Sequence, residues 1–545
     1  MTNDDLPALG AATLCEAFQL TARRYADSPA LRTPGDTQRL TYNEWAAKVE
    51  RVAGGLAELG VQRGDTVGLM TTNRTEFFVA DMAALHLGAT PFSIYNSSSP
   101  EQVEYLFGNA GNRIVIADLQ FVNAIKAANA DVTVIVLEDG LPEAGHPDFE
   151  AAWRAVEPSD FATLIYTSGT TGPPKGVQLS HANLMATVVQ WAAADLTMPQ
   201  GRMVSYLPLA HIADRFLHYY LAMAGGSSIT AVGDATQILA ALSDARPTAW
   251  MSVPRLWEKI KAALESKGLT DPSVLPEESK AAIRAQLGLD QLHWGGSGAA
   301  PIPPAVLEFF MELGLPVLEG WAMSETGCAG IVNPVDAPRL GTIGKPLPGL
   351  ETRVAEDGEL LVRGPSIMVG YRNDPEKTAE AINPEGWLHT GDIVTVDEDG
   401  YVKIVDRKKE LIINAAGKNM SPANIEQTVK ASHALIGQAC CIGDARPYNV
   451  ALLVLDPDAS AAYAAANGVD DSSPAALSQN PDVQALVAGA VEEANSRLSR
   501  VEQVKKFRIL DEDWLPDSEV LTSTSKLKRR GVNARYADLI EELYV

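Results

Sequence analysis

The segment Tyr166-Thr167-Ser168-Gly169-Thr170-Thr171-Gly172-Pro173-Pro174-Lys175-Gly176 carries more information about this chain than any other stretch of its sequence. It follows an apolar run, Phe161–Ile165, that is typical of a buried strand. A loop of this composition presents backbone N–H groups, hydroxyls and a lysine ammonium, which together suit a polyphosphate. A flexible linker is the alternative, but linkers rarely contain Pro-Pro-Lys or follow a buried strand directly. The segment therefore predicts a site for the phosphates of a nucleotide.

A Walker A loop is the familiar form of such a site, and the spacing of this segment argues against it. That motif is G-x-x-x-x-G-K-[ST], with a hydroxyl directly after the lysine to hold Mg²⁺. Counted from Gly169, the residue before Lys175 is Pro174 and the residue after it is Gly176. The segment therefore predicts a nucleotide loop of a different kind.

Residues 166–176 resemble the phosphate loop of the adenylate-forming superfamily, which includes acyl-CoA synthetases, luciferases and the adenylation domains of peptide synthetases. The resemblance runs from about residue 15 to the end of the chain, with six motifs in the family's order, and is strongest to long-chain fatty acyl-CoA synthetases. It implies that the following residues bind the phosphates of ATP: Thr167, Ser168, Gly169, Thr170, Thr171, Gly172 and Lys175.

Length and charge limit the classes of function. A chain of 545 residues is too long for a single hydrophobic core, so two or more domains are expected. The formal net charge of −25 disfavours a nucleic-acid partner and electrostatic attachment to an anionic membrane. We therefore expect the substrates to be small molecules; the sequence leaves the oligomeric state open.

The termini and the cysteines indicate the cellular setting. The acidic segment Met1–Asp5 lacks the basic and apolar regions of a signal peptide, and no run of about 18 apolar residues is present. Four cysteines do not make a disulfide framework in this length, and the adjacent Cys440 and Cys441 would point to opposite faces of a strand. These features predict a cytoplasmic protein without a transmembrane segment.

Short apolar strands alternate with helical patterns along the first part of the chain. Thr66–Met70 and Ile114–Ala117 have the composition of strands, and Glu76–Leu87 that of a helix. This alternation predicts an α/β fold of layered, parallel sheets. From Leu340 to Val405, short strands separated by turn residues predict a compact β subdomain.

A dense charge run, Asp406–Glu410, follows this β subdomain. We place the domain boundary there, with residues 1–405 as a large adenylation domain containing the ATP and acyl sites. Residues 406–545 would form a small α+β domain, and the resemblance implies that it is mobile and carries a catalytic lysine. Within it, Asp456–Asn480 is expected to be a surface excursion.

The segment Glu319–Gly327 resembles a second motif of the superfamily, aromatic-x-x-[ST]-Glu-Thr. An aromatic ring beside a glycine-lined slot can stack on adenine, and a carboxylate is a hard oxygen ligand for Mg²⁺. The resemblance assigns nucleotide contacts to Gly320, Trp321, Ser324 and Thr326, a catalytic role to Glu325, and the metal to Glu325 and Thr167. The alternative is that Trp321 belongs to the core and Glu325 is a solvated acid.

Two further segments of the large domain resemble nucleotide-binding parts of the family. Small residues in Gly295–Pro301 permit close approach of the backbone to adenine and the acyl chain; the nucleotide contacts implied are Gly296, Ser297, Gly298 and Ala299. Asp392 resembles the aspartate that accepts hydrogen bonds from both ribose hydroxyls, and Arg407 a second ribose or phosphate contact. The alternatives are an ordinary tight turn for the glycines and a turn-forming aspartate.

The resemblance assigns the remaining roles to four residues. Lys526 would contact both the substrate carboxylate and the α-phosphate, with its neighbour Lys528 as the structural alternative. His211 would line the carboxylate end of the acyl pocket, unless it is simply a buried histidine. Lys409 would be the hinge of the small domain, and Gly417 would turn towards the pantetheine channel. Arg215 stands where some relatives carry an aromatic residue that gates the acyl pocket. The sequence therefore does not decide whether this pocket has a gate.

Taken together, these motifs predict ATP-dependent conversion of a medium- to long-chain fatty acid to acyl-AMP and then to acyl-CoA, with release of pyrophosphate and AMP. ATP, Mg²⁺ and coenzyme A are the implied cofactor and co-substrates. The alternatives are delivery of the acyl group to a carrier-protein thiol, or activation of an aromatic or steroid acid. A nucleotide-dependent regulator and a P-loop ATPase are less consistent with the combined motifs. Chain-length preference is not readable from the sequence.

Overall fold

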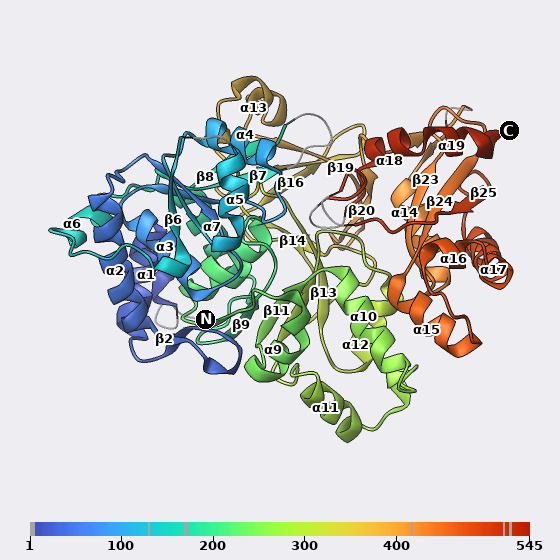
Figure 1. Cartoon of the computed structure of the whole chain (residues 1–545), viewed down its shortest axis with the longest axis horizontal. Coiled ribbons are helices and arrows are strands. Elements are labelled where there is room, and N and C mark those ends of the chain that lie inside the picture. The colour runs from blue at the N-terminus through green and yellow to red at the C-terminus, as the bar shows by residue number, and fades with distance from the viewer. Residues whose placement is uncertain (1–5, 129–130, 168–172, 416–417, 516–517, 523–525) are drawn as a thin grey trace.

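A computed structural model describes residues 6–128, 131–167, 173–415, 418–515, 518–522 and 526–545. The chain forms a large domain and a small carboxyl-terminal domain that lies beside it (Figure 1). Among the helices of these residues, none combines the length and the apolar character needed to cross a bilayer.

A seven-stranded sheet forms the centre of the large domain, in the order β18-β8-β7-β4-β3-β5-β6. The strands β7, β4, β3, β5 and β6 are parallel, whereas β8 and β18 add antiparallel neighbours at one edge. Their bounds are β3 (Thr66–Met70), β4 (Thr90–Ser93), β5 (Ile114–Ala117), β6 (Thr133–Val136), β7 (Phe161–Thr167), β8 (Lys175–Ser180) and β18 (Gly370–Tyr371). The predicted strands β3 and β5 are confirmed at the expected bounds.

Helices cover both faces of this sheet, which explains why its strands are continuous apolar runs rather than alternating ones. Leu69 and Ile116 pack in the same core as α1, α2 and α3, whereas the next residues, Met70 and Ala117, pack in another core with α4 and α5. The helices of the large domain are α1 (Leu14–Arg24), α2 (Tyr42–Glu58), α3 (Thr75–His86), α4 (Pro100–Ala110), α5 (Val122–Ala127), α6 (Phe149–Arg154), α7 (His181–Ala193), α8 (Leu221–Ala224), α9 (Ile238–Ala245), α10 (Pro254–Glu265), α11 (Glu277–Gln286), α12 (Pro304–Glu312) and α13 (Pro375–Ala381).

Three further sheets complete the large domain. One mixed sheet has the order β2-β1-β10-β9 and another β11-β12-β13-β14-β15, while β16-β17-β19-β20 is antiparallel throughout. The bounds are β1 (Pro29–Arg32), β2 (Arg39–Thr41), β9 (Arg202–Ser205), β10 (Ser228–Ala231), β11 (Ala249–Ser252), β12 (Trp294–Ser297), β13 (Val317–Ala322), β14 (Gly330–Val332), β15 (Lys345–Pro346), β16 (Glu351–Val354), β17 (Glu359–Arg363), β19 (Leu388–Val396) and β20 (Val402–Arg407). The antiparallel sheet confirms the β subdomain expected from the sequence. The boundary predicted at residue 406 falls inside β20, and the exact division of the domains stays a prediction.

The small domain is α+β, as expected. Its sheet β23-β24-β25 is antiparallel and then parallel. Cys440 and Cys441 of β23 are buried and face two different cores, which confirms the prediction from their adjacency. Its elements are β21 (Ile412–Ile413), β22 (Asn419–Met420), α14 (Pro422–Ser432), β23 (Ile436–Ile442), β24 (Asn449–Leu455), α15 (Pro457–Asn467), α16 (Pro474–Ser478), α17 (Pro481–Arg497), β25 (Val504–Ile509), α18 (Arg529–Arg535) and α19 (Ala537–Tyr544).

Helix α10 lies near the start of α15 (Figure 1), and ion pairs between them connect the two domains. Arg255 of α10 pairs with Asp456, and Lys259 lies 2.7 Å from Asp458. Asp456 is buried, and its other carboxylate oxygen accepts the N–H of Ala459, which caps α15. The segment Asp456–Asn480 is therefore more than the surface excursion expected, because its first residues form part of the domain interface.

A fully buried ion pair lies between α3 and the π-helical segment Asp214–Tyr220. Arg215 pairs with Asp81 and donates hydrogen bonds to the hydroxyls of Ser93 and Tyr220, at 2.8 and 3.0 Å. Arg215 is thus held within the core of the large domain in this structure, by partners that satisfy a charge otherwise costly to bury.

Candidate active site

The predicted phosphate segment joins two antiparallel strands, a topology that differs from the strand-to-helix turn of a Walker loop. Thr167, the last residue of β7, pairs with Lys175, the first of β8. Ser168, Gly169, Thr170, Thr171 and Gly172 lie outside the described residues. Lys175 lines a polar pocket of about 80 Å³ together with Tyr371 and Lys377, and its ammonium lies 4.6 Å from the centre of the Tyr371 ring. The pocket places a cation beside the predicted phosphate site.

Glu325 lies in the turn that follows β13 and is buried. The hydroxyl of Tyr371 donates to its Oε1 at 2.9 Å, and the backbone N–H of Met368 donates to its backbone carbonyl at 2.8 Å. The neighbouring Thr326 is fully buried, and its hydroxyl closes the turn by donating to the carbonyl of Ala329. Ser324 is half-buried in the same turn. The Glu325 carboxylate is therefore held in place by the hydroxyl of Tyr371.

Trp321, Asp392 and Arg407 form a hydrogen-bonded set across two sheets. The indole N–H of Trp321 in β13 donates to Asp392 Oδ2 at 2.8 Å, and Arg407 Nε lies 2.7 Å from Asp392 Oδ1. Asp392 and Arg407 are partners in the β19–β20 pairing. Burial raises the pKa of Asp392, and the charge of Arg407 opposes this shift. The structure thus brings together three residues that the sequence assigned to one nucleoside.

The glycine-rich strand β12 lies between β11 and β13, and Gly320 of β13 is half-buried. The side chain of Met251 packs against its glycines: a Cβ added at Gly296 would lie 2.6 Å from Met251 Sδ, and one at Gly298 2.5 Å from Met251 Cε. Ala299 follows with φ of +68°. Ser297 is 2% exposed, and its hydroxyl has no hydrogen-bond partner among the described residues. The Ser297 hydroxyl is therefore able to hydrogen-bond a polar group of a ligand.

Lys526 of the small domain lies within electrostatic reach of residues of the large domain. Its charge interacts with the carboxylates of Asp392 and Glu325 of the large domain. Burial of the ammonium lowers the pKa of Lys526 below its ordinary value of 10.5, and the charge of Arg407 acts in the same direction. The candidate site thus combines a cation from one domain with two carboxylates from the other.

His211 lies on the loop between β9 and the π-helical segment. Burial, together with the charge of Lys526, lowers the pKa of His211 to about 3, so the imidazole is neutral near pH 7. Asp214 holds this loop: it accepts hydrogen bonds from the hydroxyl of Ser205 at 2.5 Å and from the backbone of Leu207 at 3.2 Å. His211 is therefore a neutral group close to Lys526.

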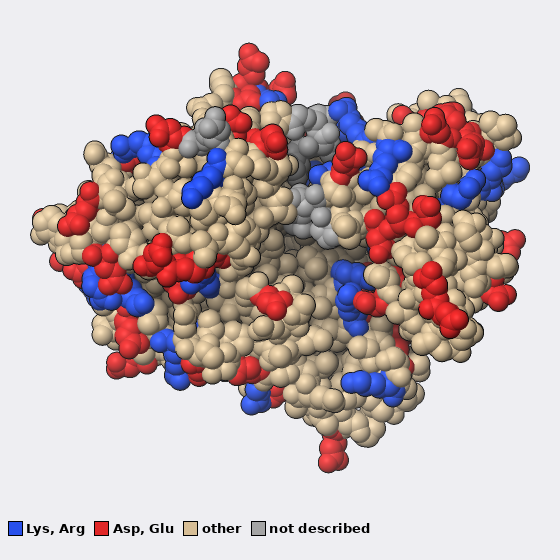
Figure 2. All heavy atoms as spheres, in the orientation of Figure 1, with Lys and Arg blue, Asp and Glu red and all other residues tan. Residues whose placement is uncertain are grey.

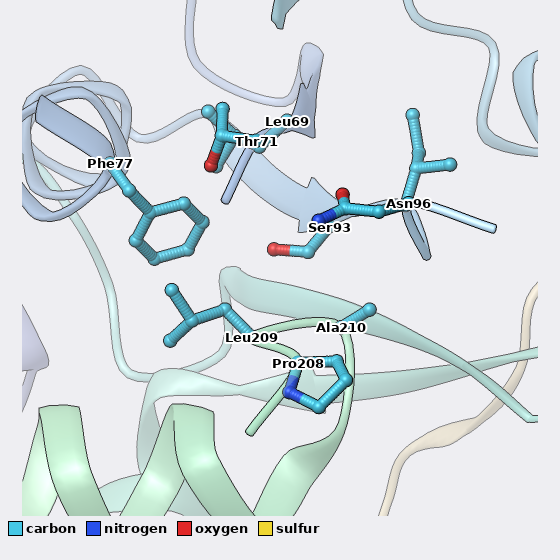
Figure 3. A pocket seen from close by; sticks show the side chains of 9 residues that line it. Leu69, Thr71, Phe77, Ser93, Asn96, Pro208, Leu209 and Ala210 are labelled. Carbon is cyan, nitrogen blue, oxygen red and sulfur yellow. The ribbon is translucent and has the colours of Figure 1, made fainter. Parts of the chain in front are cut away.

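A small cavity of about 10 Å³ lies beside this loop (Figure 3). Pro208, Leu209 and Ala210 of the loop form one wall, opposite Phe77 and Ser93. Ligand pockets usually enclose about 300–1,000 Å³. This pocket is therefore too small, in the conformation described, to contain a long acyl chain.

Other predicted residues lie apart from this cluster or outside the description. Lys409 is exposed in the turn between β20 and β21, and Gly417 lies outside the described residues. Lys528 donates to the backbone carbonyl of Ser518 at 2.9 Å, which is a structural role. Among the described residues, no group of three or more His, Cys, Asp or Glu side chains is arranged to hold a metal ion.

Three residues of this region received no catalytic role from the sequence. Tyr371, Met251 and Asp456 are ordinary in type, and their partners Glu325, Gly296 and Arg255 lie 46, 45 and 201 positions away in the chain. No local pattern identifies such long-range partners.

Acidic side chains are spread over much of the surface shown in Figure 2, consistent with the net charge of −25. A hollow separates the large domain from the small one on this face.

Comparisons with known proteins identify the family to which the chain is similar. The model of the family described as AMP-binding enzyme matches residues 18–372, and that of the AMP-binding enzyme C-terminal domain matches residues 409–545. The chain is 49% identical over 437 residues to FadD11 of Mycobacterium tuberculosis, which carries the name of a fatty-acid–CoA ligase; the match covers 73% of this chain and 76% of FadD11.

Two further matches extend over nearly the whole chain. The long-chain-fatty-acid–CoA ligase FadD15 of Mycobacterium tuberculosis is 35% identical, with 93% of this chain and 92% of FadD15 covered. The crystal structure of ATP-bound MatB from Rhodopseudomonas palustris is 25% identical, with a TM-score of 0.74 over 96% of this chain and 99% of MatB.

Proposed function

Because this chain belongs to the AMP-binding enzyme family, we propose that it activates a medium- to long-chain fatty acid with ATP and transfers the acyl group to coenzyme A. The observation that carries the proposal is the position of Lys526, which lies within electrostatic reach of Glu325 and Asp392. The names of FadD11 and FadD15 support a fatty acid as the substrate class.

The first half-reaction brings two anions together. A carboxylate is a poor acyl donor, and its conversion to acyl-AMP supplies AMP as the leaving group while pyrophosphate departs. Lys526 would offset the repulsion between the carboxylate and the α-phosphate by contacting both. His211, neutral and close to Lys526, would border the substrate carboxylate without adding charge. Catalysis of this kind relies on positioning and electrostatics, without a covalent enzyme intermediate.

The remaining site residues suit a nucleotide. The unpartnered hydroxyl of Ser297 and the close backbone of Gly296, Gly298 and Ala299 would face the adenine, together with Gly320 and Trp321. Asp392 would accept from the ribose hydroxyls, since each carboxylate oxygen can take more than one hydrogen bond. Arg407 would hold the Asp392 carboxylate in position through their ion pair. Ser324 and Thr326 would border the α-phosphate. The phosphates would be bound by Thr167, Ser168, Gly169, Thr170, Thr171, Gly172 and Lys175.

Glu325 and Thr167 would hold Mg²⁺. A single carboxylate fits this ion, which is usually bound through one or two carboxylates and the substrate phosphates. When bound, Mg²⁺ would neutralise part of the phosphate charge.

A screen of pyrophosphate release tests the proposed function. Acids of graded chain length, an aromatic acid and a steroid acid are each supplied with ATP, with and without coenzyme A. We expect pyrophosphate release with fatty acids and AMP release only with coenzyme A. Release of AMP only with a carrier protein, or activity confined to the aromatic or steroid acid, would favour one of the alternatives. No acid-dependent pyrophosphate release would overturn the proposal.

The second half-reaction requires Lys526 to leave the cleft so that the thiol can enter. We propose that the small domain turns about Lys409, which breaks the Arg255–Asp456 and Lys259–Asp458 ion pairs and brings the segment around Gly417 to the thiol channel. A turn outside regular structure suits a hinge, because its backbone angles can change without loss of sheet or helix.

Replacement of Lys409 by proline should therefore impair the second step selectively. Proline fixes φ, so Lys409→Pro should slow thioester formation from supplied acyl-AMP by about tenfold or more while sparing pyrophosphate exchange. Lys409→Ala, which leaves the backbone free, is the control and should retain both steps. Equal loss of both half-reactions in Lys409→Pro would argue against a dedicated hinge.

The lowered pKa of Lys526 predicts a pH limit for the first step. The charged ammonium is the active form, so adenylation should decline as pH rises through a pKa below 10.5. The pH profile of kcat/KM reports the free enzyme and is the appropriate measurement. Thioester formation from supplied acyl-AMP should lack this alkaline decline, and its presence there would contradict the assignment.

A further inference from the structure

Tyr371 connects two parts of the site that come from segments far apart in the chain. Its ring lies 4.6 Å from the ammonium of Lys175, which follows the phosphate segment. Its hydroxyl donates to Oε1 of Glu325 at 2.9 Å, in the turn after β13. Both interactions are made by one side chain that is 8% exposed.

The backbone of Tyr371 is fixed as well. Residue 371 pairs with Val177 of β8, the strand that begins at Lys175, and its N–H donates to Thr378 Oγ1 at 2.9 Å. The ring therefore has a constant position relative to the strand that carries the lysine. Its hydroxyl in turn fixes one oxygen of Glu325 relative to that strand.

We propose that Tyr371 is a positioning residue that holds the Glu325 carboxylate at a set distance and orientation from Lys175. The metal ion bound by Glu325 and the phosphates bound by Lys175 would then keep a fixed position relative to each other. The inference rests on the proposed function, because it takes Glu325 to be the magnesium ligand. It assigns Tyr371 no contact with substrate.

The chemistry of the contact suits this role. One carboxylate oxygen accepts from the phenol, which leaves the other oxygen and further lone pairs for a cation. A phenol carries its proton at neutral pH, so the Tyr371 hydroxyl can donate to the carboxylate. Groups that orient a metal ligand in this way typically change metal affinity by about 10–100-fold when removed.

Tyr371→Phe separates the two interactions, because it keeps the ring beneath Lys175 and removes only the hydroxyl. Binding of Mn²⁺, as a probe for Mg²⁺, is measured by electron paramagnetic resonance in the presence of a non-hydrolysable ATP analogue. We expect about tenfold weaker Mn²⁺ binding, with unchanged affinity for the analogue in the absence of metal. Tyr371→Leu, which also removes the ring, should in addition weaken metal-free binding of the analogue by about threefold.

Tyr401 provides a matched control. Like Tyr371, it is buried and has a lysine ammonium over its ring: that of Lys345 lies 4.5 Å from the ring centre. Unlike Tyr371, its hydroxyl donates to a backbone carbonyl, that of Ala337 at 2.6 Å. Tyr401→Phe should leave Mn²⁺ binding unchanged. Circular dichroism verifies the fold of each variant.

A double variant tests whether the effect passes through Glu325. Adding Tyr371→Phe to Glu325→Gln should cause no further loss of Mn²⁺ affinity, because the charged ligand is already absent. Unchanged Mn²⁺ binding in Tyr371→Phe, an equal effect in Tyr401→Phe, or an additive loss in the double variant would overturn the inference. A wild-type protein that fails to bind Mn²⁺ with the analogue would instead count against the proposed function.

Discussion

Lys526→Ala is expected to slow adenylation by about 10²–10³-fold, the scale for loss of one well-placed group that stabilises charge in the transition state. The physical reason is that Lys526 is the cation which the small domain directs towards Glu325 and Asp392, where the carboxylate and the α-phosphate would meet. Acid-dependent pyrophosphate exchange measures this step. Thioester formation from supplied acyl-AMP should be nearly unaffected, because the ammonium would have left the cleft.

Lys528 is the control for this experiment. It lies two residues further along the chain, and its ammonium donates to the carbonyl of Ser518 rather than entering the cleft. Lys528→Ala should leave pyrophosphate exchange close to the wild-type rate. Equal losses of both half-reactions in Lys526→Ala would refute the assignment of Lys526 to the first step alone.

Arg215→Met is expected to lower the free energy of unfolding of the large domain by about 3–5 kcal/mol, the usual cost of removing one partner of a buried ion pair. Asp81 would remain fully buried beside the hydroxyls of Tyr219 and Tyr220, without its cation. Urea unfolding followed by tryptophan fluorescence gives the change. The deficit should shrink as pH falls, because the raised pKa of Asp81 lets it take up a proton and become neutral.

Two comparisons make this prediction specific. Arg154 forms an exposed ion pair with Glu150 at 2.7 Å, so Arg154→Met should cost less than about 1 kcal/mol. The double variant Arg215→Met with Asp81→Leu should recover most of the lost stability, because it removes the unpaired charge. If Arg215→Met were no more damaging than Arg154→Met, the buried pair would contribute little to the fold.

The order of elements could be predicted from the sequence because strand signals are local. A strand buried on both faces is an apolar run of four or five residues, as Thr66–Met70 and Ile114–Ala117 are. The orientation of Cys440 and Cys441 to different cores follows from the two-residue repeat of a strand. The antiparallel edge of the central sheet could not be predicted, because pairing partners such as Val177 and Tyr371 are far apart in the chain.

The sequence by itself determined which residue types stand at the candidate site: a glycine- and threonine-rich loop closed by Lys175, the acid Glu325 after a strand, and Lys526 near the end of the chain. Only the tertiary structure decided that Lys526 lies within electrostatic reach of Glu325, that the Tyr371 hydroxyl donates to this carboxylate, and that Arg215 is a buried partner of Asp81. The reason is physical. Propensity, periodicity and turn chemistry act between near neighbours, whereas these contacts arise when packed sheets and domains bring distant side chains together.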